Sequence, residues 1–245
     1  WKAMKNSALS GGIVSTEADA ADYATKQLVT DYARRNIYDG ASDALFDSNG
    51  KLIAKIRPGY DDLDWAKGVE RTGHRQEYNL SAAVSGDKFN IYSSAGYLNE
   101  QGYIRNSSYE RFTGRINTTY NATKWLELGI NLSGTSANRN FNPNASGSMF
   151  ANPFYVTRYM APIYPVYLHN ADGSYLLDAD GNKQYDTTSE YLQNRNIVYE
   201  MSMDKDKTRR NVLDGLIYAK VTLPYGFTFT GKADLNHANT NRQTY

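Results

Sequence analysis

Few side chains in this sequence have the types and spacing that chemistry needs. The three histidines, His74, His169 and His237, lie far apart, and none has a second ligand at the spacing of a metal site. The chain has no cysteine, which excludes disulfides, thiolate metal sites and cysteine nucleophiles. The carboxylates are scattered, and no phosphate-binding glycine loop or serine nucleophile motif occurs. We therefore predict that the chain is not an enzyme and has no catalytic residue.

One short segment resembles half of a calcium-binding loop. Asp178 begins the stretch DADGN, whose side-chain oxygens alternate as in such a loop. A complete loop has a bidentate glutamate at its twelfth position, but that position is Ser189 and Glu190 follows one residue later. Gly181 and Asn182 are also common turn formers. The sequence thus favours a plain hairpin turn over a calcium site, and it predicts no other cofactor.

Tyrosine is the residue type in excess, with 21 copies against 8 Phe and 3 Trp. Many of these rings lie in the segment 135–210. A tyrosine ring combines a flat apolar surface, which stacks on sugars, with a hydroxyl that orients a ligand, and aromatic rings also dominate protein–protein contacts. The same rings can instead pack a loop on itself. Our candidates for substrate or partner contact are Tyr155, Tyr159, Tyr164, Tyr167 and Tyr175.

The overall composition narrows the class of protein. The chain has 245 residues, and 27 Lys and Arg against 26 Asp and Glu give a net charge of +1, so no basic excess points to nucleic acid. No apolar run reaches the roughly 18 residues of a membrane-spanning helix. A transmembrane β-barrel remains possible, because its strands cross the membrane without such a run. Since the chain opens with Trp1 and shows no signal peptide, we interpret it as an interior or processed fragment.

The elements that would position these residues are mostly strands. Four runs between 76 and 134 alternate apolar and polar residues, and two more follow in 211–245. Short turns join the runs in pairs, whereas long excursions at 99–108 and 135–210 separate the pairs. Short turns at one end and long loops at the other are the plan of an outer-membrane barrel. A soluble β-sandwich can also mix loop lengths, so this alternative remains open.

Aromatic residues stand at both ends of the apolar side of two strands. The second run begins with Phe89 and ends with Tyr97, and the third begins with Phe112 and ends with Tyr120. Amphipathic rings favour the two interfaces of a membrane, while aliphatic groups fill the middle. We therefore predict that these four rings lie at the lipid interface. In a sandwich they would belong to a protein core.

The first 75 residues mix several signals. Thr16 can cap a helix near 18–35, with Asp19 three residues further on. Asn49-Gly50 predicts a hairpin turn, and a short helix can start at Asp64-Trp65.

A series of short motifs follows in a fixed order along the chain. They are DW at 64–65, ERTGH at 70–74, YNLS at 78–81, SG at 85–86, YSSAGYLNEQG at 92–102, NSSYERF at 106–112, RIN at 115–117 and KWLELGINLS at 124–133. In these motifs the chain resembles the SusC/RagA-type TonB-dependent outer-membrane transporters. The resemblance is specific over about 64–134, weaker over 210–235 and loose elsewhere.

The resemblance implies an all-β fold, namely a segment of a large antiparallel transmembrane β-barrel with long extracellular loops, one of which contains a helix. Such transporters have 22 strands around a plug. The implied division of the chain is the end of the first barrel strand at 1–9, the first extracellular loop at 10–75, four barrel strands at 76–134, a long extracellular loop at 135–210 and two further strands at 211–245.

The resemblance also implies function and partners. The family imports oligosaccharides or peptides with energy from the TonB complex, usually together with a SusD-like surface lipoprotein, and it resides in the bacterial outer membrane. Polar strand residues would face the lumen and contact the plug. Our candidates for that contact are Arg111, Arg115, Asn117, Glu127 and Asn131. The alternative is a soluble or surface-anchored β-sandwich that binds a glycan or a protein.

Overall fold

A computed structural model describes residues 1–42, 44–141, 151–203 and 206–244. Residues 142–150 and 204–205 of the expected long loop, and Tyr245 at the end of the last expected strand, lie outside the described residues. The chain forms two compact units. We call Trp1–Val69 with Asn144–Ser202 the loop unit, and Glu70–Pro143 with Met203–Tyr245 the strand unit.

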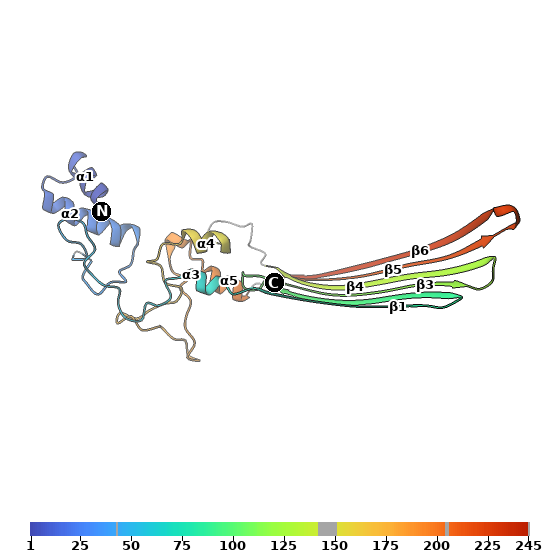
Figure 1. Cartoon of the computed structure of the whole chain (residues 1–245). Coiled ribbons are helices and arrows are strands. Elements are labelled where there is room, and N and C mark those ends of the chain that lie inside the picture. Colours follow the sequence, from blue (N-terminus) through green and yellow to red (C-terminus); the bar gives the residue numbers. More distant parts are fainter. Residues whose placement is uncertain (43, 142–150, 204–205, 245) are drawn as a thin grey trace. The chain divides into compact units, whose positions relative to one another are not determined.

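The strand unit is one antiparallel sheet in which each strand pairs with the next along the chain (Figure 1). The alternation of the sequence is therefore confirmed as strand structure. The strands continue toward the long connections beyond the residues that alternate. They can do so because backbone N–H and C=O groups form hydrogen bonds whatever side chain the residue carries. The strands are β1 (His74–Ser85), β2 (Phe89–Gln101), β3 (Ser108–Asn121), β4 (Leu126–Phe141), β5 (Asp206–Thr222) and β6 (Thr228–Thr244).

The turn between β5 and β6 is an example of the short connections in the sheet. It is the 3₁₀ turn η3 (Pro224–Gly226), in which Tyr225 and Gly226 have positive φ angles of 65° and 83°. The amide of Leu223 donates to the carbonyl of Phe227 at 2.7 Å and closes the turn. Glycine adopts this backbone region without a steric penalty.

The register of the sheet sorts the side chains onto two faces. Phe89 pairs with Tyr120 and Tyr97 pairs with Phe112, so the four expected interface rings share one face, with two at each end. We call it the apolar face. Its aliphatic residues are exposed, since 77% of Leu80 is accessible and Ile130 and Ile217 are also exposed. Among the described residues no second sheet covers this face, as a sandwich would require.

The loop unit is built from short helices and turns around its own core. The helices are α1 (Lys2–Ser10), α2 (Glu17–Lys26), the π-helical turn η1 (Gln27–Tyr32), α3 (Trp65–Val69), α4 (Pro153–Tyr159), the 3₁₀ turn η2 (Glu190–Leu192) and α5 (Ile197–Met203). Ile37, Leu45 and Ile197 are among its fully buried side chains. No helix among the described residues is long and apolar enough to cross a membrane.

The expected end of a barrel strand at 1–9 is instead the helix α1. The apolar residues of this segment recur at Trp1, Met4 and Ala8, which is helical spacing and not strand alternation. The amide of Lys5 donates to the carbonyl of Trp1 at 2.9 Å. The indole Nε1 of Trp1 donates to Thr25 Oγ1 at 2.9 Å and ties α1 to α2. The resemblance was loose here, and the local pattern was the better guide.

The helix expected near 18–35 corresponds to α2 followed by η1, from Glu17 to Tyr32. Thr16 caps it as the sequence indicated, because its hydroxyl oxygen accepts a hydrogen bond from the amide of Asp19 at 3.0 Å. The Asn49-Gly50 turn is also present, with Gly50 at φ 75°.

Candidate functional sites

The polar face of the sheet gathers the five residues expected to face the lumen. Asn117 pairs with Asn131, and Arg115 is two residues before Asn117 on β3. By the same register Arg111 and Glu127 lie on this face, toward opposite ends of it. The structure thus brings Arg115, Asn117 and Asn131 together, whereas Arg111 and Glu127 lie apart from them along the strands. Contact with a plug stays a prediction.

A cavity of about 360 Å³ on this face brings three of these residues together with acidic neighbours. Arg115, Asn117 and Asn131 line it together with Asp214 and Asp234. The side-chain amide of Asn236 donates to a carboxylate oxygen of Asp214. Polar and charged groups of both signs therefore line the cavity, which suits it to contact another polar surface.

Glu127 is held in place near the short-turn end of the polar face. The hydroxyl of Tyr218 donates to its Oε1 at 3.1 Å and lies 3.4 Å from Thr119 Oγ1. The ring of Tyr218 covers Gly129, since a Cβ atom at Gly129 would stand 1.9 Å from the ring. Only glycine leaves room for this close approach.

On the apolar face the expected interface rings form pairs across strands. The rings of Tyr97 and Phe112 have centroids 4.6 Å apart. The hydroxyl of Tyr97 reaches Glu110 Oε1 at 3.0 Å, so the ring is apolar on its body and polar at its tip. That orientation is the one an aromatic residue takes at a membrane interface.

The loop unit brings several candidate tyrosines together. Isolated bridges pair Tyr167 with Tyr185 and His169 with Tyr175. The ring centroids of Tyr167 lie 5.7 Å from Tyr175 and 4.9 Å from Tyr185. Lys183 Nζ stands 3.4 Å from the centroid of Tyr175, a cation–π contact. Tyr167 and Tyr175 are half-buried, so part of each ring is committed to this cluster.

The hydroxyl of Tyr175 donates to a carboxylate oxygen of Asp61. This hydrogen bond, with the charge of Lys183, holds the pKa of Asp61 below its ordinary value of 3.8. Burial and the same hydrogen bond raise the pKa of the Tyr175 hydroxyl. The hydroxyl therefore stays protonated at neutral pH and can donate.

The remaining three candidate tyrosines have different environments. Tyr155 and Tyr159 lie one helical turn apart on α4, with stacked rings at 4.4 Å, and 68% of Tyr159 is exposed. Tyr164 is only 3% exposed and stacks on Tyr191 at 5.1 Å. Burial raises the pKa of Tyr164. Its ring belongs to the core of the loop unit, whereas Tyr155 and Tyr159 are accessible to a ligand or partner.

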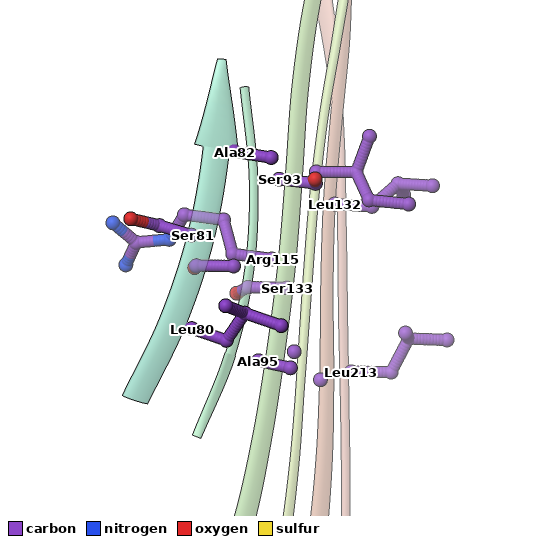
Figure 2. Close-up of a pocket in the computed structure, with 13 residues that line it drawn as sticks. Leu80, Ser81, Ala82, Ser93, Ala95, Arg115, Leu132, Ser133 and Leu213 are labelled. Carbon is purple, nitrogen blue, oxygen red and sulfur yellow. The ribbon is translucent and has the colours of Figure 1, made fainter. Parts of the chain in front are cut away.

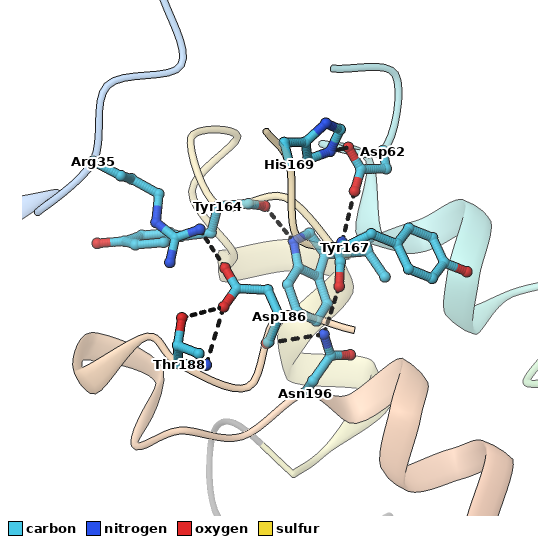
Figure 3. A network of polar contacts seen from close by, with 10 residues as sticks. Arg35, Asp62, Tyr164, Tyr167, His169, Asp186, Thr188 and Asn196 are labelled. Atoms are coloured by element: carbon cyan, nitrogen blue, oxygen red, sulfur yellow. Dashed lines mark hydrogen bonds and ion pairs between the residues drawn. The ribbon is translucent and has the colours of Figure 1, made fainter. Parts of the chain in front are cut away.

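A buried polar network that the sequence did not indicate supports these tyrosines (Figure 3). Asp186 pairs with the guanidinium of Arg35 and accepts hydrogen bonds from the amide and hydroxyl of Thr188 at 3.0 and 2.8 Å. The side-chain amide of Asn196 donates to the carbonyl of Val166 at 2.8 Å. These partners stand far apart in the sequence, so no local spacing could have revealed them.

His169 belongs to the same region (Figure 3) and is enclosed. Its Nε2 lies 2.9 Å from Asp62 Oδ1 and its Nδ1 lies 2.8 Å from the carbonyl of Gly173. The ring of Tyr60 stacks on it at 4.1 Å. Both ring nitrogens are thus used by the loop unit itself.

The segment that resembles half of a calcium loop forms a hairpin turn. Asp178 Oδ1 accepts from the amides of Asp180 and Asn182 at 2.9 and 2.8 Å, and Leu177 pairs with Lys183. These hydrogen bonds hold the pKa of Asp178 below its ordinary value. No group of three or more metal-ligating side chains occurs within the described part of the chain.

Known proteins share features with this chain in sequence and in fold. No family model matches the sequence. Among curated proteins, "TonB-dependent receptor P39" of Formosa agariphila is 25% identical over 177 residues, which are 72% of this chain and 15% of that protein. "TonB-dependent receptor P3" of the same organism is 24% identical over 185 residues, and the match covers 69% of this chain and 18% of that protein.

Solved structures agree on the fold. A structure of the RagAB peptide transporter matches with a TM-score of 0.59 at 23% identity, over 75% of this chain and 20% of that one. The RagAB peptide importer in its "closed-closed" state matches with a TM-score of 0.61 at 20% identity, over 91% and 24%. This chain therefore spans about a fifth of the length of the proteins it matches.

The open sheet, with one face apolar and one polar, is a segment of an outer-membrane β-barrel. The chain is similar to TonB-dependent receptors in sequence and to RagAB transporter chains in fold, which supports a SusC/RagA-type TonB-dependent transporter of the outer membrane. The predicted fold class is confirmed, and the sandwich alternative is wrong. The relatives are named as receptors and transporters and not as enzymes.

Proposed function

We propose that this chain is part of an active importer that takes up oligosaccharides or peptides across the outer membrane with energy from the TonB complex. The observation that supports this proposal most directly is the sheet itself, which has one polar face, suited to line a lumen, and one exposed apolar face, suited to meet lipid. The names of the sequence relatives support TonB dependence, and the structural neighbours are peptide transporters. Six strands close no lumen alone, so import requires the parent protein.

The test of import uses the full-length protein in its own host. Cells that lack the gene are complemented with it, and uptake of a labelled peptide mixture is compared with uptake of a labelled oligosaccharide mixture. We expect complementation to restore one of the two, and a protonophore to abolish it. Restored uptake that survives the protonophore would contradict energy coupling. Restoration of neither would contradict both substrate classes.

We further propose that Arg111 and Arg115 bind carboxylates of a plug inside the barrel. Among the described residues neither guanidinium forms an ion pair, and both lie on the polar face. Guanidinium groups suit bidentate carboxylate binding. In the full-length protein, Arg111→Gln with Arg115→Gln should expose the plug to protease and reduce uptake. Lys232→Gln, on the same face of β6, is the control. Unchanged plug protection in the double variant would contradict the proposal.

A SusD-like lipoprotein is the proposed partner on the extracellular side, and the exposed Tyr155–Tyr159 pair is its proposed contact. The pair offers two stacked, accessible rings on one helix turn. Tyr155→Ala with Tyr159→Ala in the full-length protein should reduce the lipoprotein recovered with it. Tyr32→Ala removes an equally exposed ring on η1 and serves as the control. Equal recovery from both variants would exclude the pair from the contact.

A further inference from the structure

The lipid-facing side of the sheet carries very few charges. Within the paired residues of β1 to β6, the only Asp, Glu, Lys or Arg side chains on the apolar face are Glu110, Lys207 and Arg209. All three lie beyond the row of Tyr97 and Phe112, toward the long-loop end of the strands. Charges on a lipid face are costly in the bilayer but not at the head-group level.

These charges border a polar pocket of about 540 Å³. The carboxylate of Glu110 is already engaged, because Tyr97 donates to Oε1 at 3.0 Å and Asn138 donates to Oε2 at 3.2 Å. Lys207 and Arg209 are exposed, and neither takes part in an ion pair of the described residues. On the apolar face the pocket thus offers two cations that pair with no carboxylate of the described residues. Amide side chains complete it, namely those of Asn138, Asn140, Asn241 and Gln243.

An apolar furrow lies on the same face, nearer to the short turns than this pocket does. Ala95, Gly114 and Gly134 are neighbours across three strands, and they form its floor. Leu80 and Leu213 stand at its two ends in the same row. The cavity measures about 480 Å³. A Cβ atom at Gly114 or Gly134 would meet nothing within 4 Å, so the floor is open.

The close-up of the furrow shows the separation of the two faces (Figure 2). Leu132 and Leu213 project to one side of the sheet, and Arg115 projects to the other. From Gly134 to Asn138 is four residues along β4, or about 14 Å at the rise of an antiparallel strand. The furrow and the cationic pocket are therefore spaced as the acyl chains and head group of one lipid are.

We infer that this face binds a phosphorylated glycolipid of the outer leaflet. Its phosphate lies between Lys207 and Arg209, its sugar hydroxyls meet the amide side chains of the pocket, and one acyl chain fills the furrow. The charge is complementary, because a phosphate accepts several charge-assisted hydrogen bonds from ammonium and guanidinium groups. The inference rests on the outer-membrane location of the barrel and not on the proposed import.

The test measures lipid binding to the full-length transporter. Protein purified from its outer membrane in detergent and stripped of lipid is titrated with diphosphorylated lipid A, and native mass spectrometry counts the bound lipid. Lys207→Gln with Arg209→Gln should weaken binding by about tenfold or more, as expected for lost hydrogen bonds to a charged group. Gly134→Leu, which fills the furrow, should weaken it severalfold. Unchanged affinity in the double variant would overturn the inference.

Matched controls come from the same strands. Arg210→Gln removes a neighbouring exposed charge on the polar face. Gly231→Leu adds the same side chain to open space on the apolar face of β6, outside the furrow. Both should bind lipid A as the unaltered protein does.

A second arm uses the unaltered protein, so that a folding defect in a variant cannot decide the matter. Dephosphorylated lipid A should bind more weakly by about the same factor as the double variant loses. Phosphatidylglycerol, which has a phosphate and no sugar, should bind between the two. Equal binding of the phosphorylated and dephosphorylated lipids, or of phosphatidylglycerol and lipid A, would overturn the assignment of a phosphorylated glycolipid. Uptake by cells plays no part in this readout.

Discussion

The two units of this chain are stabilised in different ways. The loop unit buries side chains such as Ile37, Leu45 and Ile197 completely, and a polar network lies inside it. The strand unit leaves Leu80, Ile130 and their neighbours exposed on one whole face. Apolar surface of this extent is stable only against another apolar phase. The loop unit therefore contains its own core, whereas the sheet depends on lipid and on the rest of the barrel.

The stability of the loop unit is tested most directly by removing its buried carboxylate, Asp186. Asp186 is 2% exposed and Arg35 is 22% exposed. Asp186→Ala should destabilise the loop unit by about 3 kcal/mol, the lower end of the range for breaking a buried pair, because Arg35 keeps some water. Hydrogen exchange of the described loop residues in the full-length protein measures the effect.

The matched change is Glu190→Ala. Glu190 pairs with Arg34, and both side chains are largely exposed. Exposed pairs contribute about 0–1 kcal/mol, so this variant should exchange almost as the unaltered protein does. If both variants lost hydrogen-exchange protection to the same extent, the network around Asp186 would contribute no more to the stability of the loop unit than an exposed ion pair does.

For the sheet, the corresponding test places a charge on each face in turn. Ile130 lies on the apolar face of the sheet, and its neighbour Asn131 lies on the polar face. Ile130→Lys should destabilise the barrel by about 2–4 kcal/mol at mid-bilayer, and Asn131→Lys by much less. Denaturant unfolding of the full-length protein in lipid gives both values. Equal costs would mean that the two faces meet the same environment.

The same contrast explains what the sequence could predict. Each strand repeats its pattern every two residues, so the placement of Phe89 and Tyr97 on one side of β2, and of Phe112 and Tyr120 on one side of β3, follows from local alternation. In the loop unit the decisive partners are distant, as with Arg35 and Asp186, and no periodicity links them. Sequence alone could not separate buried Tyr164 from exposed Tyr159, because both lie in the same aromatic-rich segment.

The beginning of the chain teaches a related lesson. A resemblance that was specific from 64 onward implied a strand at 1–9, but the helical spacing of Trp1, Met4 and Ala8 gave α1. A family pattern is informative where its motifs are present and weak where they are absent.

A smaller effect is expected where the sheet packs on itself. A methyl group at Gly129 would collide with the ring of Tyr218. Gly129→Ala should therefore cost about 1–3 kcal/mol through overpacking. In a Tyr218→Ala background the same change should cost almost nothing, because the ring is gone. The double-mutant cycle is measured by the same denaturant unfolding, and additive costs would contradict the close packing.

The smallest expected effect is a pH dependence in the loop unit that involves Asp61 and Tyr175. The folded pKa of Asp61 lies below its ordinary value of 3.8, because Tyr175 donates to it and Lys183 attracts it. A depressed carboxyl pKa stabilises the fold at every pH above the ordinary value, and this contribution is lost as the pH falls from there through the folded value. Hydrogen exchange around residues 167–185 should therefore rise below about pH 4. Tyr175→Phe should reduce that rise, because it removes the hydrogen bond to Asp61. An acid response of equal size in Tyr175→Phe would assign it to another carboxylate of the loop unit, such as Asp178, whose pKa is also lowered.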